Sequence, residues 1–361
     1  MGAVAAASEV SISASSVGSG VAAFGQRLRA YFGQACGGIP VVRRCVITSD
    51  NARILVIGAG VNGSVCAAWL FEYGADVTVL ARGKRLAEIQ RNGLVIENAF
   101  SQKRTVAGVR AIGELPPRDI YDYVLVVVRR DQVAELLPTL AANNSPNVVF
   151  MNNNLSGPGE IVAALGPQRP MLGFVFAGGK RDGEIIRTIG PFRHSLMPTP
   201  FGEIDGKVTP RLKRLVNLLN RAGLRAKVST NIVDYLATHA CLVAVLAGPL
   251  AMKCGADVKS VARSGDDLKL AAAALRETIP VLGALGHRVV PPGLKILAIM
   301  PVSILAFLLR QFANSKIGEV GAGWHAQQGA GEMLALADDL RAAVTRSGVP
   351  APAIRRVLDM K

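Results

Sequence analysis

Residues 53–63 read Arg-Ile-Leu-Val-Ile-Gly-Ala-Gly-Val-Asn-Gly, and this stretch decides the fold. A short apolar run leads into Gly58-x-Gly60-x-x-Gly63, and a helix-compatible segment follows at residues 64–73. Three glycines at this spacing between a strand and a helix predict a dinucleotide-binding turn. The sequence therefore predicts an α/β fold of the doubly wound, Rossmann type, with its first strand inside residues 53–63.

Each position of the loop has a predicted part in holding the cofactor. Gly58 permits the tight turn, Gly60 lets the backbone approach a pyrophosphate, and Gly63 allows the helix to pack close to the strand. The helix N-terminus then faces the anion. With Val61 and Asn62 between the glycines, the loop supplies five predicted cofactor-binding residues.

The second strand indicates which dinucleotide is preferred. Residues 76–80, Asp-Val-Thr-Val-Leu, alternate as a strand does and run into Ala-Arg82-Gly-Lys84-Arg85. An NAD site usually has a carboxylate at this point, whereas a guanidinium can hold a 2′-phosphate through paired hydrogen bonds. We therefore expect NADP, with Arg82 and Lys84 as ligands. The alternative is a basic helix start that faces water, above all for Arg85.

Length and charge narrow the classes of function. A chain of 361 residues is expected to form two domains. The net charge of +15 and a pI of about 10.1 are compatible with nucleic-acid binding. However, the basic residues are scattered, aromatic residues make up only 5%, and no nucleic-acid-binding signature occurs. We expect the charge to attract an anionic cofactor and a small anionic carbonyl substrate instead.

The five cysteines show no spacing typical of metal ligands. Their number is odd, and no CxxC or Cys/His pair has the spacing of metal ligands. This pattern favours a reducing compartment and argues against a metal site. Cys66 and Cys241 lie in apolar segments, so both are expected to be small core residues.

The first fifty residues differ in composition from the rest. Residues 1–20 are mostly Ala, Ser, Gly and Val, and Arg27, Arg29, Arg43 and Arg44 follow with almost no acidic residues. We predict a disordered leader, 1–50, that folding and cofactor binding do not need, in a cytoplasmic protein. The alternative is an organellar transit peptide.

The most apolar stretch, 296–309, is about 14 residues long, is broken by Pro301, and lies between Lys295 and Arg310. A bilayer needs about 20 residues, so no membrane span is predicted. We expect a buried core helix, with a membrane contact as the alternative.

The remaining pattern predicts two domains, a cofactor domain at 51–205 and a helical substrate domain at 206–361. Strands are expected at 93–97, 122–128, 147–151 and 171–176, and a hairpin is expected from 183–189 and 194–197. Helices are expected at 84–92, 131–140, 211–222, 232–250, 266–285, 294–312 and 332–347. In such sheets ligands bind beyond the carboxyl ends of the strands, where the loops at Gly58, Arg129 and Asn152 are predicted to meet.

Over residues 53–361 the chain resembles the ketopantoate reductases (2-dehydropantoate 2-reductases). The resemblance rests on the glycine loop, the Val-Thr-Val-Leu-Ala-Arg-Gly-Lys-Arg-Leu segment, Asn-Gly-Leu-Val-Ile-Glu at 92–97, Arg-Asp-Gly-Glu-Ile-Ile-Arg-Thr-Ile-Gly at 181–190, Glu332, and Ser-Gly-Val-Pro-Ala-Pro at 347–352. It implies NADPH-dependent reduction of a 2-oxo acid. It also implies that Asn153 lies beside nicotinamide and substrate, that Glu332 contacts substrate hydroxyls, and that Arg129 lies near the cofactor.

The chain departs from that family where a catalytic lysine is expected. The lysine position falls on Thr238 or His239, and Lys253 follows too late along the helix. His239 is therefore the leading candidate for the proton donor, because imidazole titrates near neutrality. His325 is the second candidate. A core histidine at 239, and a simple helix-start carboxylate at Glu332, are the alternatives.

Two classes of function stay open from the sequence. The first is an NADPH-dependent reductase of a 2-oxo acid or a related small carbonyl acid, with His239, Glu332 and Asn153 as catalytic residues. The second is a catalytically inactive NADP-binding sensor or regulatory protein. The oligomeric state is not determined by the sequence, and a homodimer is one of the alternatives.

Overall fold

The computed structural model of the chain describes residues 52–174, 178–188, 199–246, 258–315, 318–319 and 330–360. The chain divides into two compact units, residues 1–49 and residues 50–361. The predicted leader, 1–50, lies outside the described residues, so its properties stay predictions. The second unit carries all the elements below.

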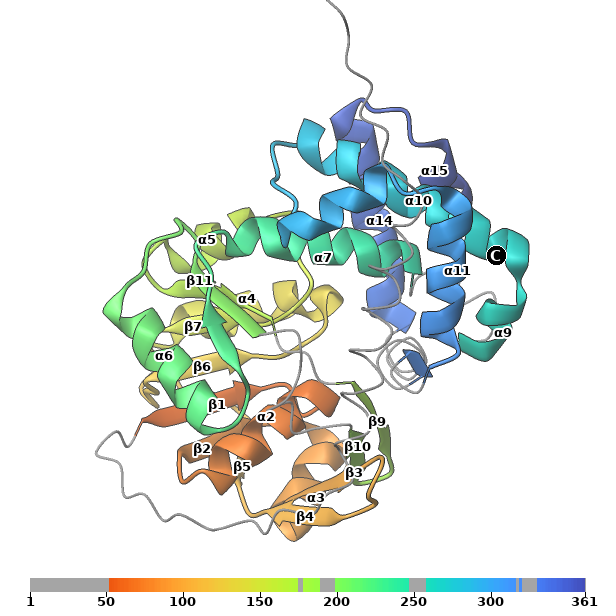
Figure 1. The fold of residues 1–361 in the computed structure, drawn as a ribbon. Coiled ribbons are helices and arrows are strands. Elements are labelled where there is room, and N and C mark those ends of the chain that lie inside the picture. Colours follow the sequence, from red (N-terminus) through yellow and green to blue (C-terminus); the bar gives the residue numbers. More distant parts are fainter. Residues whose placement is uncertain are drawn as a thin grey trace, which may run out of the picture. The chain divides into compact units, whose positions relative to one another are not determined.

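Within the described residues, eight strands form the main sheet in the order β12-β11-β8-β7-β6-β1-β2-β5 (Figure 1). Their bounds are β1 Arg53–Ile57, β2 Asp76–Leu80, β5 Arg110–Ile112, β6 Tyr123–Val126, β7 Val148–Phe150, β8 Pro170–Gly173, β11 Thr199–Glu203 and β12 Ala226–Val228. Neighbouring strands run parallel except β8 and β11. The chain reverses its direction of strand addition at β1, which has β2 on one side and β6 on the other. This order confirms the doubly wound fold.

Both faces of the sheet are covered by helices, which explains the continuous apolar runs of its strands. Ile54 and Val56 of β1 belong to a core with helices α2 (Val61–Glu72) and α6 (Pro210–Arg221). Leu55 and Ile57 belong to a second core with α4 (Val133–Ala142) and α5 (Gly159–Leu165). Alternate residues of one strand therefore serve opposite layers.

A smaller sheet, which the sequence did not predict as such, lies against α2. Its order is β4-β3-β10-β9, with β3 Leu94–Asn98, β4 Arg104–Ala107, β9 Gly179–Asp182 and β10 Ile185–Thr188. The predicted hairpin of 183–189 with 194–197 needs correction, because the hairpin is formed by β9 and β10. Gly183 adopts a φ of +58° in its turn, and residues 189–198 lie outside the described part.

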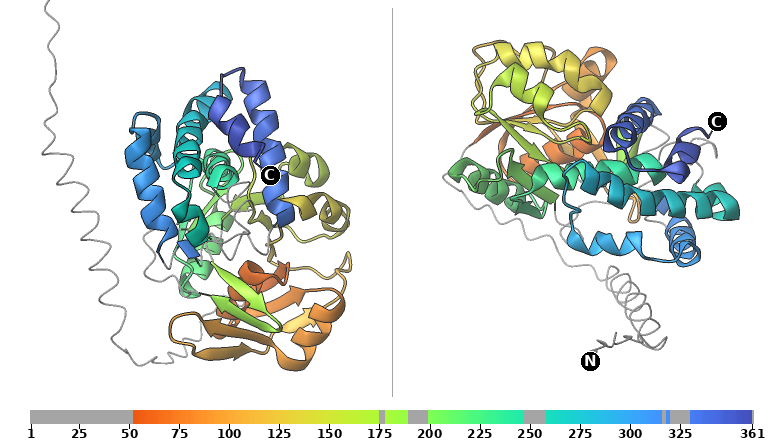
Figure 2. Two further views of the ribbon diagram at one scale, coloured as in Figure 1. Left: turned by 90° about the vertical axis from the view of Figure 1, so that its right-hand side faces the viewer. Right: turned by 90° about the horizontal axis from the view of Figure 1, so that it is seen from above.

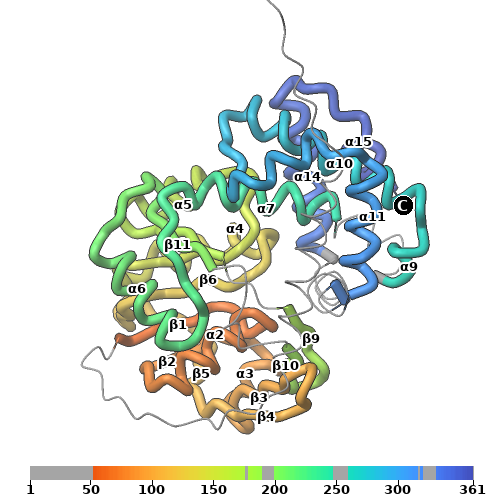
Figure 3. The backbone as a smooth tube through the Cα atoms, in the orientation of Figure 1, coloured from red at the N-terminus to blue at the C-terminus, as the bar shows by residue number. Residues whose placement is uncertain are grey.

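Helices make up the C-terminal part, as predicted (Figure 3). They are α7 Ile232–Leu246, α9 Val258–Arg263, α10 Gly265–Ala284, the 3-10 helix η3 Pro292–Ala298, α11 Val302–Ala313, α14 Ala330–Ser347 and α15 Pro352–Leu358. Small side chains of α7 and α10, such as Ala240, Ala271 and Ala274, are fully buried in their common core. The division at 205/206 stays a prediction, and the main sheet itself reaches Val228 through β12.

The expectation of a buried helix at 296–309 needs correction. Leu305 and Ala306 are buried, but Ile296, Ile299, Ile304 and Phe307 are exposed. Apolar residues on all sides of this segment suggested complete burial, whereas only its inner face packs on the rest of the helical core. Among the described residues, no helix is both long and apolar enough to cross a membrane.

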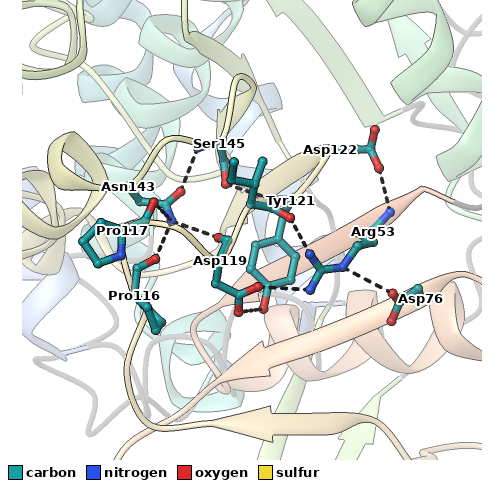
Figure 4. A network of polar contacts seen from close by, with 10 residues as sticks. Arg53, Asp76, Pro116, Pro117, Asp119, Tyr121, Asp122, Asn143 and Ser145 are labelled. Atoms are coloured by element: carbon teal, nitrogen blue, oxygen red, sulfur yellow. Dashed lines mark hydrogen bonds and ion pairs between the residues drawn. The ribbon is translucent and has the colours of Figure 1, made fainter.

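A polar network fixes the amino-terminal end of β1, at the opposite edge from the glycine loop (Figure 4). The Arg53 guanidinium donates to Asp119 at 3.0 Å and to the Ile120 carbonyl at 2.6 Å, and it stacks on the Tyr121 ring at 4.7 Å. Tyr121 donates its hydroxyl to Asp119 at 2.7 Å. These contacts fasten the loop before β6 to β1, so the network is structural.

Candidate functional site

The glycine turn after β1 has the geometry of a dinucleotide-binding loop. Gly58 has a φ of +107°, and a Cβ there would lie 2.3 Å from the carbonyl oxygen of Val127. A Cβ on Gly63 would lie 1.8 Å from the Gly58 oxygen. Neither site can therefore carry a side chain. A Cβ on Gly60, in contrast, would meet no atom within 4 Å, so this backbone is open to a ligand.

Helix α2 begins directly at this open backbone. Gly60 is its N-cap residue and offers no side-chain cap, and Val61 and Asn62 are half-buried in the first turn. The first turn also carries no acidic residue. Free N–H groups at a helix start favour an anion, so the predicted loop fits the pyrophosphate of a dinucleotide.

The side chain of Arg85 holds the glycine loop through hydrogen bonds, a role that the sequence did not predict. Its guanidinium donates to the Ala59 carbonyl at 3.2 Å, to Ser64 Oγ at 3.2 Å, to Glu88 at 3.2 Å and to the Glu184 carbonyl at 3.3 Å. Its side chain is only 9% exposed. Burial lowers the pKa of Arg85, and the Glu88 carboxylate opposes that shift. The alternative that Arg85 faces water is therefore wrong.

Arg82 and Lys84 lie at the end of β2 and are exposed. Arg82 is the N-cap residue of α3 (Gly83–Asn92), and the first turn of that helix has no acidic residue. Lys84 is 4.0 Å from Glu88 one turn along the helix. Two cations thus stand in solvent at the point where a 2′-phosphate would be held.

The carboxyl ends of three neighbouring parallel strands bring further residues to the edge where β1 ends. Arg129 follows β6, the asparagines 152–154 follow β7, and Phe174 follows β8. Arg129 pairs with Asp131 at 3.1 Å. The hydrogen bond to Asp131 raises the pKa of Arg129, and the charge of Glu332 adds to this effect.

Asn153 and Glu332 meet at this edge, although 179 positions separate them in the sequence. Asn153 donates its side-chain N–H to Glu332 Oε1 at 2.8 Å, and both side chains are buried. Glu332 lies in the first turn of α14, so it is both a helix-start carboxylate and part of the site. No described residue donates to Oδ1 of Asn152, Asn153 or Asn154, and these oxygens are buried. Buried oxygen atoms of this kind normally accept a hydrogen bond from a donor.

A second set of contacts fastens α14 to the same edge. Ser156 donates to Asp339 at 2.9 Å, and Arg130 lies 3.7 Å from Asp339 and 3.4 Å from Glu160. Arg130 starts the short 3-10 helix η1 (Arg130–Gln132), directly after Arg129. The Asn153–Glu332 bond is therefore one of several polar contacts that the described residues make between α14 and this edge of the sheet.

His239 lies on α7 near this edge. Its ring centroid is 4.2 Å from that of Phe174 and 6.1 Å from that of Tyr235, and the side chain is half-buried. Leu155, directly after the three asparagines, shares an apolar cluster with Ala240 of α7. The neighbouring Thr238 is fully buried and binds the Asp234 carbonyl and the Val290 N–H. Of the two residues at the lysine position, His239 alone has an accessible side chain.

Among the described residues, one further histidine and two cysteines remain to be placed. His287 contacts Asp234 at 3.0 Å through Nδ1, while His325 and His194 lie outside the described residues. Cys66 and Cys241 are fully buried, as expected, and burial raises the pKa of each thiol to about 12. Neither thiol is a nucleophile at neutral pH.

The turn, the strand order and the helical part define the class as a Rossmann-type dinucleotide-binding fold with a helical C-terminal domain. Residues 54–195 match the family model described as "Ketopantoate reductase PanE/ApbA". This matched segment of the chain is similar to the ketopantoate reductase family.

Several curated proteins are similar to part of this chain. An uncharacterized oxidoreductase, YkpB, of Bacillus subtilis is 28% identical over 49% of this chain and 56% of its own length. The 2-dehydropantoate 2-reductase of Pyrococcus horikoshii is 26% identical over 51% of this chain and 58% of its own length. The matched region thus spans little more than half of these two relatives.

The fold is also shared with a solved oxidoreductase. D-mandelate dehydrogenase in complex with NADH and anilino(oxo)acetate has a TM-score of 0.69 at 14% identity, over 85% of this chain and 96% of that one. At this identity the likeness concerns the fold alone.

Proposed function

We propose that this chain is an NADPH-dependent reductase of a 2-oxo acid or a related small carbonyl acid. The observation that carries the proposal is the buried hydrogen bond between Asn153 and Glu332. It joins the loop after β7 to the helical part at the sheet edge where dinucleotides bind. A buried carboxylate and amide at this edge suit a small polar substrate beside the cofactor.

The cofactor assignment rests on the charges at the end of β2. Arg82 and Lys84 are exposed there, and Arg85 is committed to the loop. A 2′-phosphate could be bound by the guanidinium and the ammonium. A ribose 2′-hydroxyl needs a carboxylate that accepts its hydrogen bond, and none of the described residues directly after β2 supplies one. Gly58, Gly60, Val61, Asn62 and Gly63 would hold the pyrophosphate.

In the proposed reaction the bound cofactor supplies the hydride, and the protein holds the substrate and moves the proton. The half-buried imidazole of His239 donates the proton to the carbonyl oxygen. Glu332 accepts hydrogen bonds from substrate hydroxyls, and Asn153 orients Glu332 and the substrate. Arg129 adds a positive charge near the cofactor. The oxo acid in the D-mandelate dehydrogenase complex supports a substrate of this chemical class.

The second candidate function is an NADP-binding sensor or regulatory protein without catalysis. Two observations favour it. Thr238, at one of the two possible lysine positions, is buried and bonded to backbone groups. His239, at the other, packs against Phe174 and Tyr235 as a core histidine does.

The test is a measurement of cofactor affinity followed by a screen for turnover. Titration with NADPH and with NADH should show clear preference for NADPH. A panel of 2-oxo acids is then screened by the oxidation of NADPH. Glu332→Gln, which keeps the shape and hydrogen bonding of the side chain, should lower turnover while NADPH binding persists.

The outcomes separate the two candidates. Turnover of any 2-oxo acid that Glu332→Gln reduces supports the reductase. Tight NADPH binding with no turnover across the panel supports the sensor. Equal affinity for both cofactors, or none for either, would contradict the cofactor assignment.

A further inference from the structure

The outward side of η3 and α11 carries a concentration of exposed apolar side chains. Twelve large apolar side chains are exposed in the described part of the chain, and five of them fall within residues 296–312. They are Ile296, Ile299, Ile304, Phe307 and Phe312, and Ile299 is 78% exposed. Exposed apolar residues are ordinary when scattered, but a cluster of this size marks an interaction surface. We call these five residues the apolar face.

The apolar face is spread over η3, the residue directly after it, and α11. Ile296 lies in η3, and Ile299 follows its end, where the Ile299 N–H donates to the Ile296 carbonyl at 3.2 Å. In α11, Ile304 and Phe307 are one turn apart, while Leu305 and Ala306 turn inward and are buried. In the two views of Figure 2, α11 lies at the outside of the helical part.

The charged side chains within residues 286–315 are all basic, apart from His287. Residues 286–315 contain Arg288, Lys295 and Arg310, all of them exposed, and no acidic residue. The adjoining elements α9 and α10 carry Asp266 and Asp267 near their junction, but residues 258–315 together hold seven Lys and Arg against three acidic residues. A partner that fits this face would therefore offer an apolar region for the exposed side chains and negative charges for the flanking basic residues.

We infer that the apolar face docks on the surface of an anionic phospholipid membrane. An interfacial helix buries Ile and Phe side chains at the boundary of headgroups and acyl chains, while flanking Lys and Arg meet anionic lipid. Lys295 and Arg310 flank the apolar face in this way. The inference concerns a surface contact, which is compatible with the absence of a spanning helix among the described residues.

A second copy of the chain is a less suitable occupant. A two-fold contact through the same face would bring two sets of Lys295 and Arg310 together. No carboxylate from residues 286–315 would lie between them. A membrane surface would bury the apolar side chains and also neutralise the basic ones, whereas self-association would only bury the apolar side chains.

The experiment is co-sedimentation of the full chain with vesicles. One set is phosphatidylcholine alone and the other contains phosphatidylglycerol as well. The protein should sediment with the anionic vesicles, and added salt should weaken that binding. Ile299→Ser with Phe307→Ser should lower the partition coefficient by about tenfold or more, since two large apolar side chains no longer enter the interface. Lys295→Gln should lower it by about fivefold.

The matched control is Phe100→Ser, because Phe100 is 58% exposed but lies in the loop after β3, away from α11. It should bind vesicles as the unchanged chain does. Thermal unfolding and NADPH binding of all variants should be unchanged, since the altered side chains are exposed.

Three results would overturn the inference. The first is no binding of the full chain to anionic vesicles. The second is binding that Ile299→Ser with Phe307→Ser leaves intact. The third is a dimer in light scattering that the same double variant converts to a monomer. This result would show that the apolar face binds a second copy of the chain.

Discussion

Replacing Arg85 by methionine is expected to affect stability and cofactor binding through separate contacts. Methionine keeps much of the apolar length of the side chain but removes the donors to Ala59, Ser64, Glu88 and Glu184. Glu88 then keeps its charge while its side chain is only 5% exposed. The exposed Lys84 lies 4.0 Å from Glu88.

The magnitude follows from these contacts. Breaking a buried ion pair by removing one partner costs about 3–5 kcal/mol, so Arg85→Met should lower the free energy of unfolding by roughly that amount. Loss of the charged donor to the Ala59 carbonyl also loosens the loop. A hydrogen bond to a charged group contributes about 1.5–3 kcal/mol, which predicts at least about tenfold weaker NADPH binding.

A double variant separates the two effects. In Arg85→Met with Glu88→Leu the buried carboxylate is gone, so urea unfolding should show most of the lost stability restored. NADPH affinity, measured by fluorescence titration, should stay low because Ala59 still lacks its donor. Arg91→Met, an exposed cation at the end of the same helix, is the control and should change neither quantity. The reasoning is refuted if Arg85→Met unfolds at the unchanged urea concentration, or if the double variant regains full NADPH affinity.

Four further predictions concern the loop, the cofactor, the proton donor and acid stability. Arg82→Ala should weaken NADPH binding by about 1.5–3 kcal/mol and leave NADH binding unchanged in titrations. Gly63→Ala should destabilise the fold by about 1–3 kcal/mol in urea unfolding, whereas Gly60→Ala, in open space, should weaken NADPH binding without a change in stability. For a reductase, His239→Ala should cost about 10²–10⁴-fold in turnover with NADPH binding intact. The pKa of Asp119 lies below its ordinary 3.8, because hydrogen bonds from Tyr121 and Arg53 outweigh the raising effect of burial. Its contribution to stability is therefore present above about pH 4 and lost at lower pH, so Asp119→Asn should reduce stability at neutral pH and flatten its decline in acid.

The glycine loop could be recognised from the sequence because its chemistry is local. The turn, the strand before it and the helix after it lie within about twenty consecutive residues. Each glycine is required because the backbone at its position leaves no room for a side chain or must approach the ligand closely. The cations after β2 and the core positions of Cys66 and Cys241 could be predicted for the same reason. The period of the apolar pattern gave most helices of the C-terminal part to within a few residues.

The helical segment around 296–309 shows where periodicity fails. A segment that is apolar on all sides is typical of a buried helix, and nothing in its own residues tells which side another element covers. The structure leaves Ile299 and Phe307 exposed because α10 covers only one side of η3 and α11. Coverage depends on the placement of distant elements, so a local pattern cannot determine it.

By itself, therefore, the sequence determined the fold class, the glycine turn after β1 and the cations after β2. Only the tertiary structure decided that Arg85 turns inward to Ala59 while Arg82 stays in solvent, and that Asn153 meets Glu332. Positions 153 and 332 are distant in the chain, and their contact exists because the carboxyl edge of the sheet faces the start of α14. The physical reason is that local sequence fixes backbone conformation and apolar period, whereas partners for buried polar groups are set by the packing of whole elements.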